Sequence, residues 1–288
     1  MAHPQIATFA RLANGGPLPS RMIAGQATKL SRTMHDLRYD EVNDEFLVTN
    51  PFAQAVLVFR GGADGNEGPI RIIQGSKTHL GSVDRLDVDP VNDEILVPNG
   101  DSVLVFSRTA NGNVAPLRMI QGSNTQLRNA TTLSVDPVHN LLVVGLNKSG
   151  RVVQQAPDGT MTARSPGQDG ALLVYNRTDN GNVKPRNVIR GPQSGIVRIT
   201  QMAVYPPRKL VIATQPGEIS DMEPENAFVG VWSLDDNGDV APRWRINAGP
   251  KSTMKKPRGV VLDPKHKEVI IADMRLNAVL TFYFPEIF

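Results

Sequence analysis

The sequence predicts an all-β fold, a β-propeller built from four-stranded antiparallel blades. Three observations predict it: a hairpin sequence that recurs five times, a short apolar strand that follows each hairpin, and a composition rich in turn residues. The chain has 288 residues with 25 Gly and 22 Pro, so we expect frequent turns and few long helices. Repeated units of about 45 to 50 residues with four short strands each are typical of propellers.

The recurring hairpin supplies the first two strands of each unit. Its second strand is apolar and ends in Asn, Gln or Asp. The five copies lie at 38–50, 87–99, 134–147, 203–215 and 261–273. The equivalent turn residues Val42 and Val91 are 49 positions apart, whereas the equivalent residues Val138 and Pro207 are 69 positions apart. Some units therefore carry insertions.

The third and fourth strands of each unit follow the hairpin. Copies of the third strand lie at 56–59, 103–106, 172–175, 229–232 and 279–282, with a sixth at 6–9. An Asn, Asp and Gly turn comes next, followed by Pro and a short strand that ends in Gly. The segments 111–122 and 180–191 show this most clearly.

The number of inner strands indicates five blades, and the unit length leaves six as the alternative. The chain starts with a third and a fourth strand (6–10 and 21–25) and ends after a third strand (279–282). We therefore expect a single domain, 1–288, whose ring is closed by N- and C-terminal strands that share a blade. The chain then has one more copy of the third strand than such a ring needs. Both a monomer and a strand-exchanged dimer therefore remain open as the state of the protein.

The last unit reads GVVLDP from Gly259, EVIIAD from Glu268 and AVLTF from Ala278. This pattern resembles the NHL repeat, whose strands usually read Gly-Ile-Ala-Val-Asp, Ile-Tyr-Val-Ala-Asp and a strand that ends in Phe. The early units depart from it, because Asp36-Leu37 and Arg85-Leu86 replace the Gly-Ile opening. The resemblance implies a divergent propeller of this kind, in a family that includes protein-binding, RNA-binding and enzymatic members.

Composition excludes several classes of function. The chain has no Cys, which excludes disulfides, thiolate metal sites and a Cys nucleophile. No apolar run approaches the roughly 18 residues of a membrane-spanning helix, so we expect no membrane insertion. The first residues carry no basic segment followed by an apolar one. The compartment stays undetermined between the cytoplasm and export with a signal removed.

Catalytic templates are missing from the sequence: it has no GxSxG elbow, no P-loop and no dinucleotide fingerprint. Some propellers are hydrolases of the lactonase or esterase type that hold a central calcium with Glu, Asn and Asp from different blades, which no local motif reveals. Calcium is the cofactor that this alternative implies. Its candidate ligands are the polar residues that end second strands and the acids of an insertion: Asn50, Asn99, Asn147, Asp273, Glu218, Asp221 and Glu223.

A structural interpretation of the same residues competes with the metal site. A polar residue that ends the second strand of every unit is expected to bond turn backbone, since one central ligand rarely needs five copies of a group. The histidines receive a similar interpretation: His139 and His266 occupy equivalent hairpin turns, and no HExxH motif accompanies them.

Charge segregates between the two ends of the predicted blades, although the formal net charge is only +3. Loops from a fourth strand to the next first strand are basic, whereas the hairpin turns at the other end are acidic. A basic face of this kind attracts an acidic or phosphate-bearing partner. The candidate partner-binding residues are Lys29, Arg32, Lys77, Arg85, Arg128, Arg198, Lys255, Lys256 and Arg258.

Two insertions, at 148–170 and 216–227, fall between second and third strands and thus on the basic face. The first contains an Asp158-Gly159 turn and is expected to form a hairpin. The sequence favours a non-catalytic interaction module that binds a macromolecule through this face, and a protein is the favoured partner. Calcium-dependent hydrolysis is the alternative and RNA binding the third hypothesis, which the lack of stacking aromatic residues in these loops disfavours.

Overall fold

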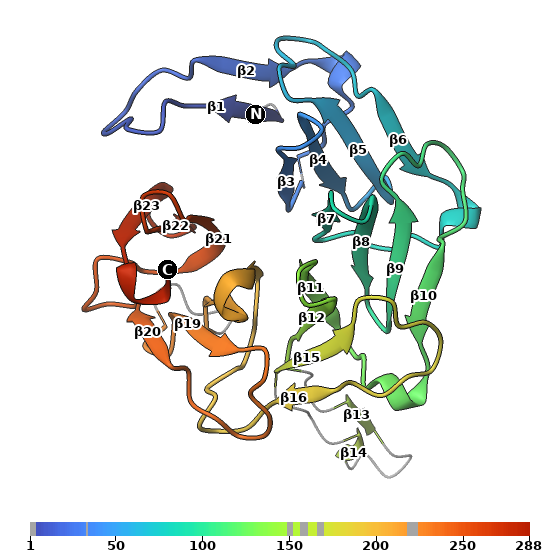
Figure 1. The fold of residues 1–288 in the computed structure, drawn as a ribbon, viewed down its shortest axis with the longest axis vertical. Helices are drawn as coiled ribbons and strands as arrows, with labels where there is room; N and C mark the ends of the chain where they lie inside the picture. The colour runs from blue at the N-terminus through green and yellow to red at the C-terminus, as the bar shows by residue number, and fades with distance from the viewer. Residues whose placement is uncertain (1–3, 33, 149–151, 156–160, 166–169, 218–223) are drawn as a thin grey trace. The chain divides into compact units, whose positions relative to one another are not determined.

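The computed structural model describes residues 4–32, 34–148, 152–155, 161–165, 170–217 and 224–288. It confirms the fold class: an all-β, five-bladed propeller of mostly four-stranded antiparallel sheets (Figure 1). The chain divides into two compact units, 1–99 with 104–118, and 100–103 with 119–288. The sharing of a blade by the terminal strands stays a prediction.

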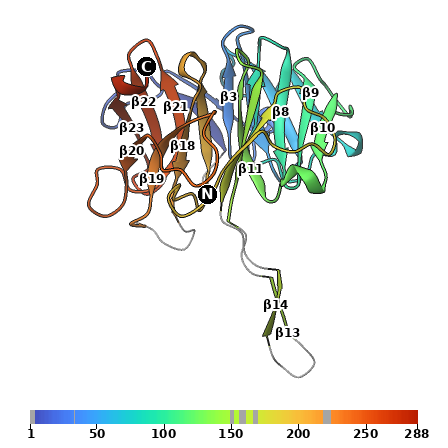
Figure 2. The same ribbon diagram turned by 60° about the horizontal axis from the view of Figure 1, so that its bottom comes forward.

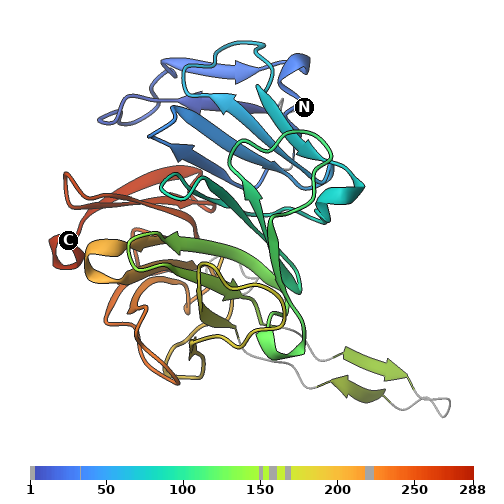
Figure 3. The ribbon, with the colours of Figure 1, turned by 45° about the vertical axis from the view of Figure 1, so that its right-hand side comes forward.

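The first unit contains the strands of the N-terminus. The pair β1 (Gln5–Thr8) and β2 (Arg21–Ala24) forms a two-stranded antiparallel sheet. The first blade follows in the order β3 (Leu37–Asp40), β4 (Glu45–Asn50), β5 (Ala55–Arg60) and β6 (Arg71–Gln74), side by side in Figure 3. The second blade contains β7 (Asp87–Asp89), β8 (Glu94–Asn99), β9 (Ser102–Ser107) and β10 (Arg118–Gln121), and its residues 100–103 and 119–121 are assigned to the second unit.

The second unit contains the remaining blades. The third consists of β11 (Ala130–Asp136), β12 (Leu141–Leu146), β15 (Ala171–Asn176) and β16 (Asn187–Ile189). The fourth consists of β17 (Gln201–Tyr205), β18 (Leu210–Gln215), β19 (Phe228–Ser233) and β20 (Trp244–Asn247). The fifth is three-stranded, with β21 (Pro257–Asp263), β22 (Glu268–Asp273) and β23 (Ala278–Tyr283).

Two long connections separate second from third strands, β12 from β15 and β18 from β19. The first contains a separate antiparallel hairpin, β13 (Val152–Gln155) and β14 (Met161–Ser165), drawn in Figure 2. Its turn residues Asp158 and Gly159 lie outside the described residues. The second insertion separates β18 from β19.

Apolar side chains of the middle strands form the core of each unit. In the first unit, Phe46 of β4 and Phe59 of β5 stack with ring centroids 5.1 Å apart. In the second unit, Trp232 of β19 is 1% exposed and packs among residues of the third and fourth blades. Burial on both faces explains why these middle strands are almost continuously apolar. The described residues also form five short 3-10 helices: η1 (Gln26–Thr28), η2 (Ser76–Thr78), η3 (Ser123–Thr125), η4 (Pro206–Arg208) and η5 (Pro285–Ile287).

Candidate functional site: the basic loops between blades

The loops that follow β2, β6, β10 and β16 share one local structure. A Gly ends the strand, and a Thr or Ser three residues later bonds its carbonyl: Thr28 Oγ1 lies 2.6 Å from Gly25 O, and Thr78 Oγ1 lies 2.6 Å from Gly75 O. The loops at Gly122 and Gly191 repeat this bond. These bonds close a tight turn that then presents the following residues, among them Lys29, at the end of the blade.

In the first unit these loops carry three exposed basic side chains, Lys29, Arg32 and Lys77. Within the described chain, none of the three forms an ion pair. Arg85 belongs to the same set, but it is half-buried and its Nη1 donates to the carbonyl oxygens of His35 (2.6 Å) and Asp84 (2.9 Å). Arg85 therefore joins two neighbouring loops, whereas the other three side chains face solvent.

A buried carboxylate lies beneath these loops. Asp36 is 7% exposed, and its Oδ2 accepts the backbone N–H of Leu86 at 3.1 Å, while its own N–H donates to Thr49 Oγ1 at 3.0 Å. Burial raises the pKa of the Asp36 carboxyl above its usual range, although Arg38 and Arg85 oppose this. Asp36 thus links β3 to β7 and contributes little charge to the exposed surface.

In the second unit the predicted basic residues divide in the same way. Arg128 is exposed, whereas Arg198 and Arg258 are half-buried. Lys255 is half-buried and its Nζ donates to Pro250 O at 2.8 Å, so its ammonium group holds its own loop. Lys256 is only 1% exposed. It is thus a core side chain in the structure, although the sequence predicted it on the binding face.

The amide residues that end second strands bond loop backbone. Asn50 Oδ1 accepts the Ala53 N–H at 3.3 Å and Asn99 Oδ1 accepts the Gly81 N–H at 2.8 Å. In the second unit, Asn147 Oδ1 accepts the Ile199 N–H at 2.9 Å. Asp273 Oδ2 accepts the N–H groups of Lys255 (2.6 Å) and Lys256 (2.9 Å). This agrees with the structural interpretation, because the oxygens offered as metal ligands already serve as backbone acceptors. Glu218, Asp221 and Glu223 lie outside the described residues.

The opposite ends of the blades are less acidic than their sequence suggests. Asp40 is 1% exposed and its Oδ1 accepts the N–H groups of Val42 and Asn43, both at 3.1 Å. Asp89 and Asp136 hold their turns in the same way. These carboxylates therefore stabilise the hairpin turns instead of forming an acidic surface.

One group of side chains in the described residues has ligand atoms close enough for a metal ion: Asp263, His266 and Glu268, all within 4.8 Å. His266 Nδ1 lies 2.7 Å from Asp263 Oδ2. The hairpin of the third blade has the same arrangement, with His139 Nδ1 2.8 Å from Asp136 Oδ2. Because the pair recurs at equivalent turns, it is explained as turn structure.

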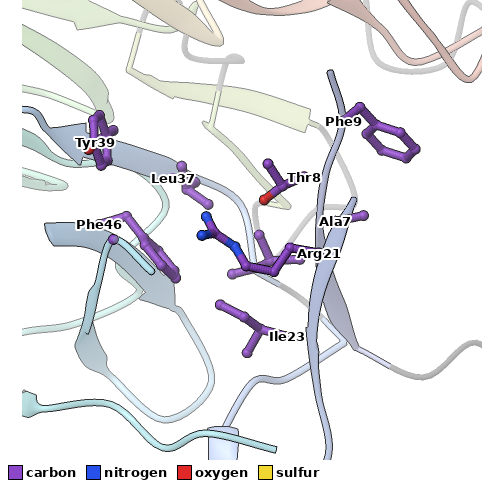
Figure 4. Close-up of a pocket in the computed structure, with 10 residues that line it drawn as sticks. Ala7, Thr8, Phe9, Arg21, Ile23, Leu37, Tyr39 and Phe46 are labelled. Carbon is purple, nitrogen blue, oxygen red and sulfur yellow. The ribbon is translucent and has the colours of Figure 1, made fainter. Parts of the chain in front are cut away.

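A half-open cavity of about 370 Å³ lies in the first unit beside β1. Figure 4 shows its apolar lining, which includes Phe9, Leu37, Tyr39 and Phe46, with Arg21 among them. Tyr39 is 56% and Phe9 48% exposed. This cavity was not predicted from the sequence, because its walls come from β1 to β4, which only the fold brings together.

Comparisons with known proteins identify the fold alone. No family model matches the chain. No curated protein matches it either. Among solved structures, hydrazine synthase of Kuenenia stuttgartiensis is similar with a TM-score of 0.56 and 13% sequence identity. The similarity covers 91% of this chain and 66% of that one, so the present chain spans less than two thirds of its length. It supports the β-propeller fold.

In the described residues, no helix is long and apolar enough to cross a membrane. The described helices are 3-10 turns of three residues each.

Proposed function

We propose that this protein is a non-catalytic interaction module, a divergent NHL-like propeller that binds an acidic protein surface through its exposed loop lysines and arginines. The observation that carries the proposal is the trio Lys29, Arg32 and Lys77. These side chains are exposed and, in the part of the chain that the structure describes, free of ion pairs. Charges of one sign on rigid loops attract an oppositely charged partner and accelerate its association.

The loops beneath the trio favour binding over catalysis. Their polar groups hold backbone: Thr28 bonds Gly25, Thr78 bonds Gly75, and Asp36 bonds the Leu86 N–H. Such loops are ordered before a partner arrives, so binding costs little conformational entropy. The similarity of the last unit to the NHL repeat is consistent with this role, since that family includes protein-binding members.

The first experiment measures binding to immobilised poly-L-glutamate, a defined acidic polypeptide. The test variant combines Lys29→Glu, Arg32→Glu and Lys77→Glu. A matched control variant combines Lys184→Glu, Lys265→Glu and Lys267→Glu, three exposed lysines of turns at the other ends of the blades, with the same change of net charge. We expect the test variant to lose at least tenfold in affinity and the control variant to bind as the wild type does.

Equal loss in both variants would contradict the proposal, because it would mean that net charge alone drives binding. A second arm replaces poly-L-glutamate with a mixed-sequence RNA 20-mer. RNA binding that is tighter than binding to poly-L-glutamate and that falls steeply with salt would overturn the choice of a protein partner.

A further inference from the structure

Three arginines begin strands of similar sequence. The strands β2, β6 and β10 read RMIA, RIIQ and RMIQ, and their first residues are Arg21, Arg71 and Arg118. Arg21 and Arg71 also match in their surroundings, because each lies two residues before an isoleucine, Ile23 or Ile73, that bridges the Gly of a later turn. The three arginines therefore occupy one equivalent position.

In two of the three strands this arginine binds a glutamate at two points. Arg71 donates to Glu45 in two hydrogen bonds, of 2.7 and 2.6 Å. Arg118 binds Glu94 in the same way. Each glutamate begins the second strand of the same sheet. A guanidinium group at this position is thus oriented to bind both oxygens of a carboxylate.

Arg21 lacks such a partner. Its sheet consists of β1 and β2, so no second strand supplies a glutamate within that sheet. Arg21 is half-buried and, among the residues that the structure describes, its guanidinium group forms no hydrogen bond or ion pair. The group has lost part of its hydration without a compensating bond, which favours the uptake of an anion.

The guanidinium group extends into the cavity of about 370 Å³ beside β1. Figure 4 shows Arg21 reaching from β2 toward the strands that carry Leu37 and Phe46. Arg21 is the charged residue of a lining that is otherwise apolar or uncharged, and Leu37 and Tyr39 are 40% and 56% exposed. The volume is in the range of sites for small molecules. The cavity thus combines one cation with apolar and aromatic walls.

Backbone hydrogen bonds hold the two walls of the cavity together. Gly65 N donates to Met22 O at 2.9 Å, and Ala24 N donates to Gly65 O at 2.8 Å. Met22 N also donates to Asp64 Oδ1 at 3.1 Å. These bonds fix β2 to the first blade, so the cavity is formed before a ligand arrives and binding costs little ordering.

We propose that Arg21 and this cavity bind a small apolar carboxylic acid. The carboxylate lies on the guanidinium group, as that of Glu45 lies on Arg71, and the apolar body packs against the walls from β3 and β4. Thr8 pairs with Arg21 across the two strands and adds a hydroxyl group beside it. This activity is additional to the proposed binding of an acidic protein.

Isothermal titration calorimetry with three probes tests the proposal. The probes are 2-naphthoate, the neutral 2-naphthamide with the same rings, and acetate, which has the carboxylate alone. We expect 2-naphthoate to bind at least tenfold more tightly than either of the others. Equal affinity for 2-naphthoate and 2-naphthamide would overturn the proposal, because the charge of Arg21 would then play no part.

Arg21→Met removes the charge and keeps an unbranched apolar side chain. We expect it to weaken 2-naphthoate binding at least tenfold and to leave the melting temperature near that of the wild type. Lys184→Met, at an exposed lysine of the second unit, makes the same change of net charge and should bind as the wild type does. Full binding of 2-naphthoate by Arg21→Met would overturn the proposal.

Thr8→Trp tests the cavity independently of the charge. Thr8 is exposed on β1, and aromatic side chains favour strands, so we expect the sheet to form. The indole ring should fill the cavity and reduce 2-naphthoate binding at least tenfold. Unchanged binding by a folded Thr8→Trp protein would place the acid elsewhere and overturn the proposal.

A glutamate of the chain itself is the competing occupant. Glu268 begins the second strand of the three-stranded fifth blade, as Glu45 does in the first blade. Because Arg21 forms no ion pair with any described carboxylate, we expect Glu268→Gln to bind 2-naphthoate as the wild type does. Binding that is at least tenfold tighter in Glu268→Gln than in the wild type would identify this glutamate as the occupant and overturn the proposal.

Discussion

Arg71 and Glu45 form a two-point ion pair between the fourth and second strands of the first blade. Arg71 Nη1 lies 2.7 Å from Glu45 Oε1, and Nη2 lies 2.6 Å from Oε2. Arg108 Nη1 donates to the same carboxylate at 3.2 Å. Arg118 and Glu94 repeat the two-point pair in the second blade. The partners of each pair are 24 to 26 residues apart in sequence and lie on the second and fourth strands, so the pairs fasten the outer strands of the first and second blades.

Glu45→Gln should make the protein less stable at neutral pH and less sensitive to acid. The Arg71 hydrogen bonds hold the pKa of the Glu45 carboxyl below its usual range. Its ionised form therefore stabilises the fold above the usual pKa, and this contribution is lost as pH falls through the lowered value. We expect a loss of about 1.5 to 3 kcal/mol at pH 7.

The measurement is urea unfolding between pH 2 and 7. The difference between wild type and Glu45→Gln should shrink toward the acid end of this range. Glu41→Gln changes an exposed carboxylate of the same hairpin and should have little effect. A Glu45→Gln difference that stays constant with pH would contradict the ion-pair explanation.

The Asn111–Asn113 turn bonds the backbone of the preceding blade, where Gly112 N donates to Ile72 O at 2.6 Å and Asn113 Oδ1 accepts the Lys77 N–H at 2.7 Å. Gly112 and Gly75, which lie on the two sides of this contact, should differ in their tolerance of alanine. Gly112 has φ +76° and open space around the position that a Cβ would occupy, so Gly112→Ala should cost about 1 to 2 kcal/mol from backbone strain alone. Gly75 has φ +125° and its Cβ would lie 2.5 Å from Asn113 Cγ, so Gly75→Ala should cost about 3 kcal/mol or more.

Thermal unfolding of the two variants tests the order. Adding Asn113→Gly to Gly75→Ala should recover part of the loss, because it removes the side chain that the methyl group meets. An equal cost of the two alanine substitutions, or no recovery, would mean that the close approach of Asn113 does not explain the Gly at position 75.

Tyr175→Phe should reduce the loss of stability at alkaline pH. Tyr175 is fully buried and its hydroxyl donates to Thr125 O. Burial raises the pKa of Tyr175 far above its usual value. The unfolded chain therefore loses this proton at lower pH than the folded one, and stability falls as pH rises above about 10.

Unfolding followed from pH 8 to 11.5 checks this. Tyr175→Phe should cost about 1 kcal/mol at pH 8 through the lost hydrogen bond, and its stability should then fall less steeply than that of the wild type. The exposed Tyr283→Phe serves as the control. Parallel pH profiles for wild type and Tyr175→Phe would contradict the assignment.

Removal of divalent metal should leave the melting temperature unchanged. Asn50, Asn99, Asn147 and Asp273 already accept backbone N–H bonds, so a calcium ion would have to displace them. The measurement is thermal unfolding with excess EDTA, then with added calcium, magnesium, zinc or manganese. A rise with calcium would favour the alternative of a calcium-dependent hydrolase, since a ligand of the folded state raises its midpoint.

Strands and turns were predictable because their signals are local. Alternating and continuous apolar runs bounded by Gly, Pro, Asn and Asp identified the strands of the repeated units. The Asn residues that end second strands were expected to bond the backbone of the adjoining turn, as Asn50 does with Ala53. Asn99 and Asn147 instead accept N–H groups of more distant loops, at Gly81 and Ile199.

Burial of charge and pairing between strands were not predictable in this way. Lys256 and Lys29 both lie in loops of basic sequence, yet one is 1% exposed and the other faces solvent. Arg71 pairs with Glu45 across 26 positions, and Asn111 Oδ1 accepts the Ile72 N–H across 39 positions. The cavity beside Phe9 and Tyr39 is likewise lined by separate strands.

The sequence by itself determined the repeated strands and the type of fold, because period, turn chemistry and apolar runs act between neighbours along the chain. The tertiary structure decided which basic groups stay exposed and which turns hydrogen-bond the strand of a neighbouring blade. These properties depend on desolvation and on backbone hydrogen bonds between distant segments, and both exist only once the sheets are packed.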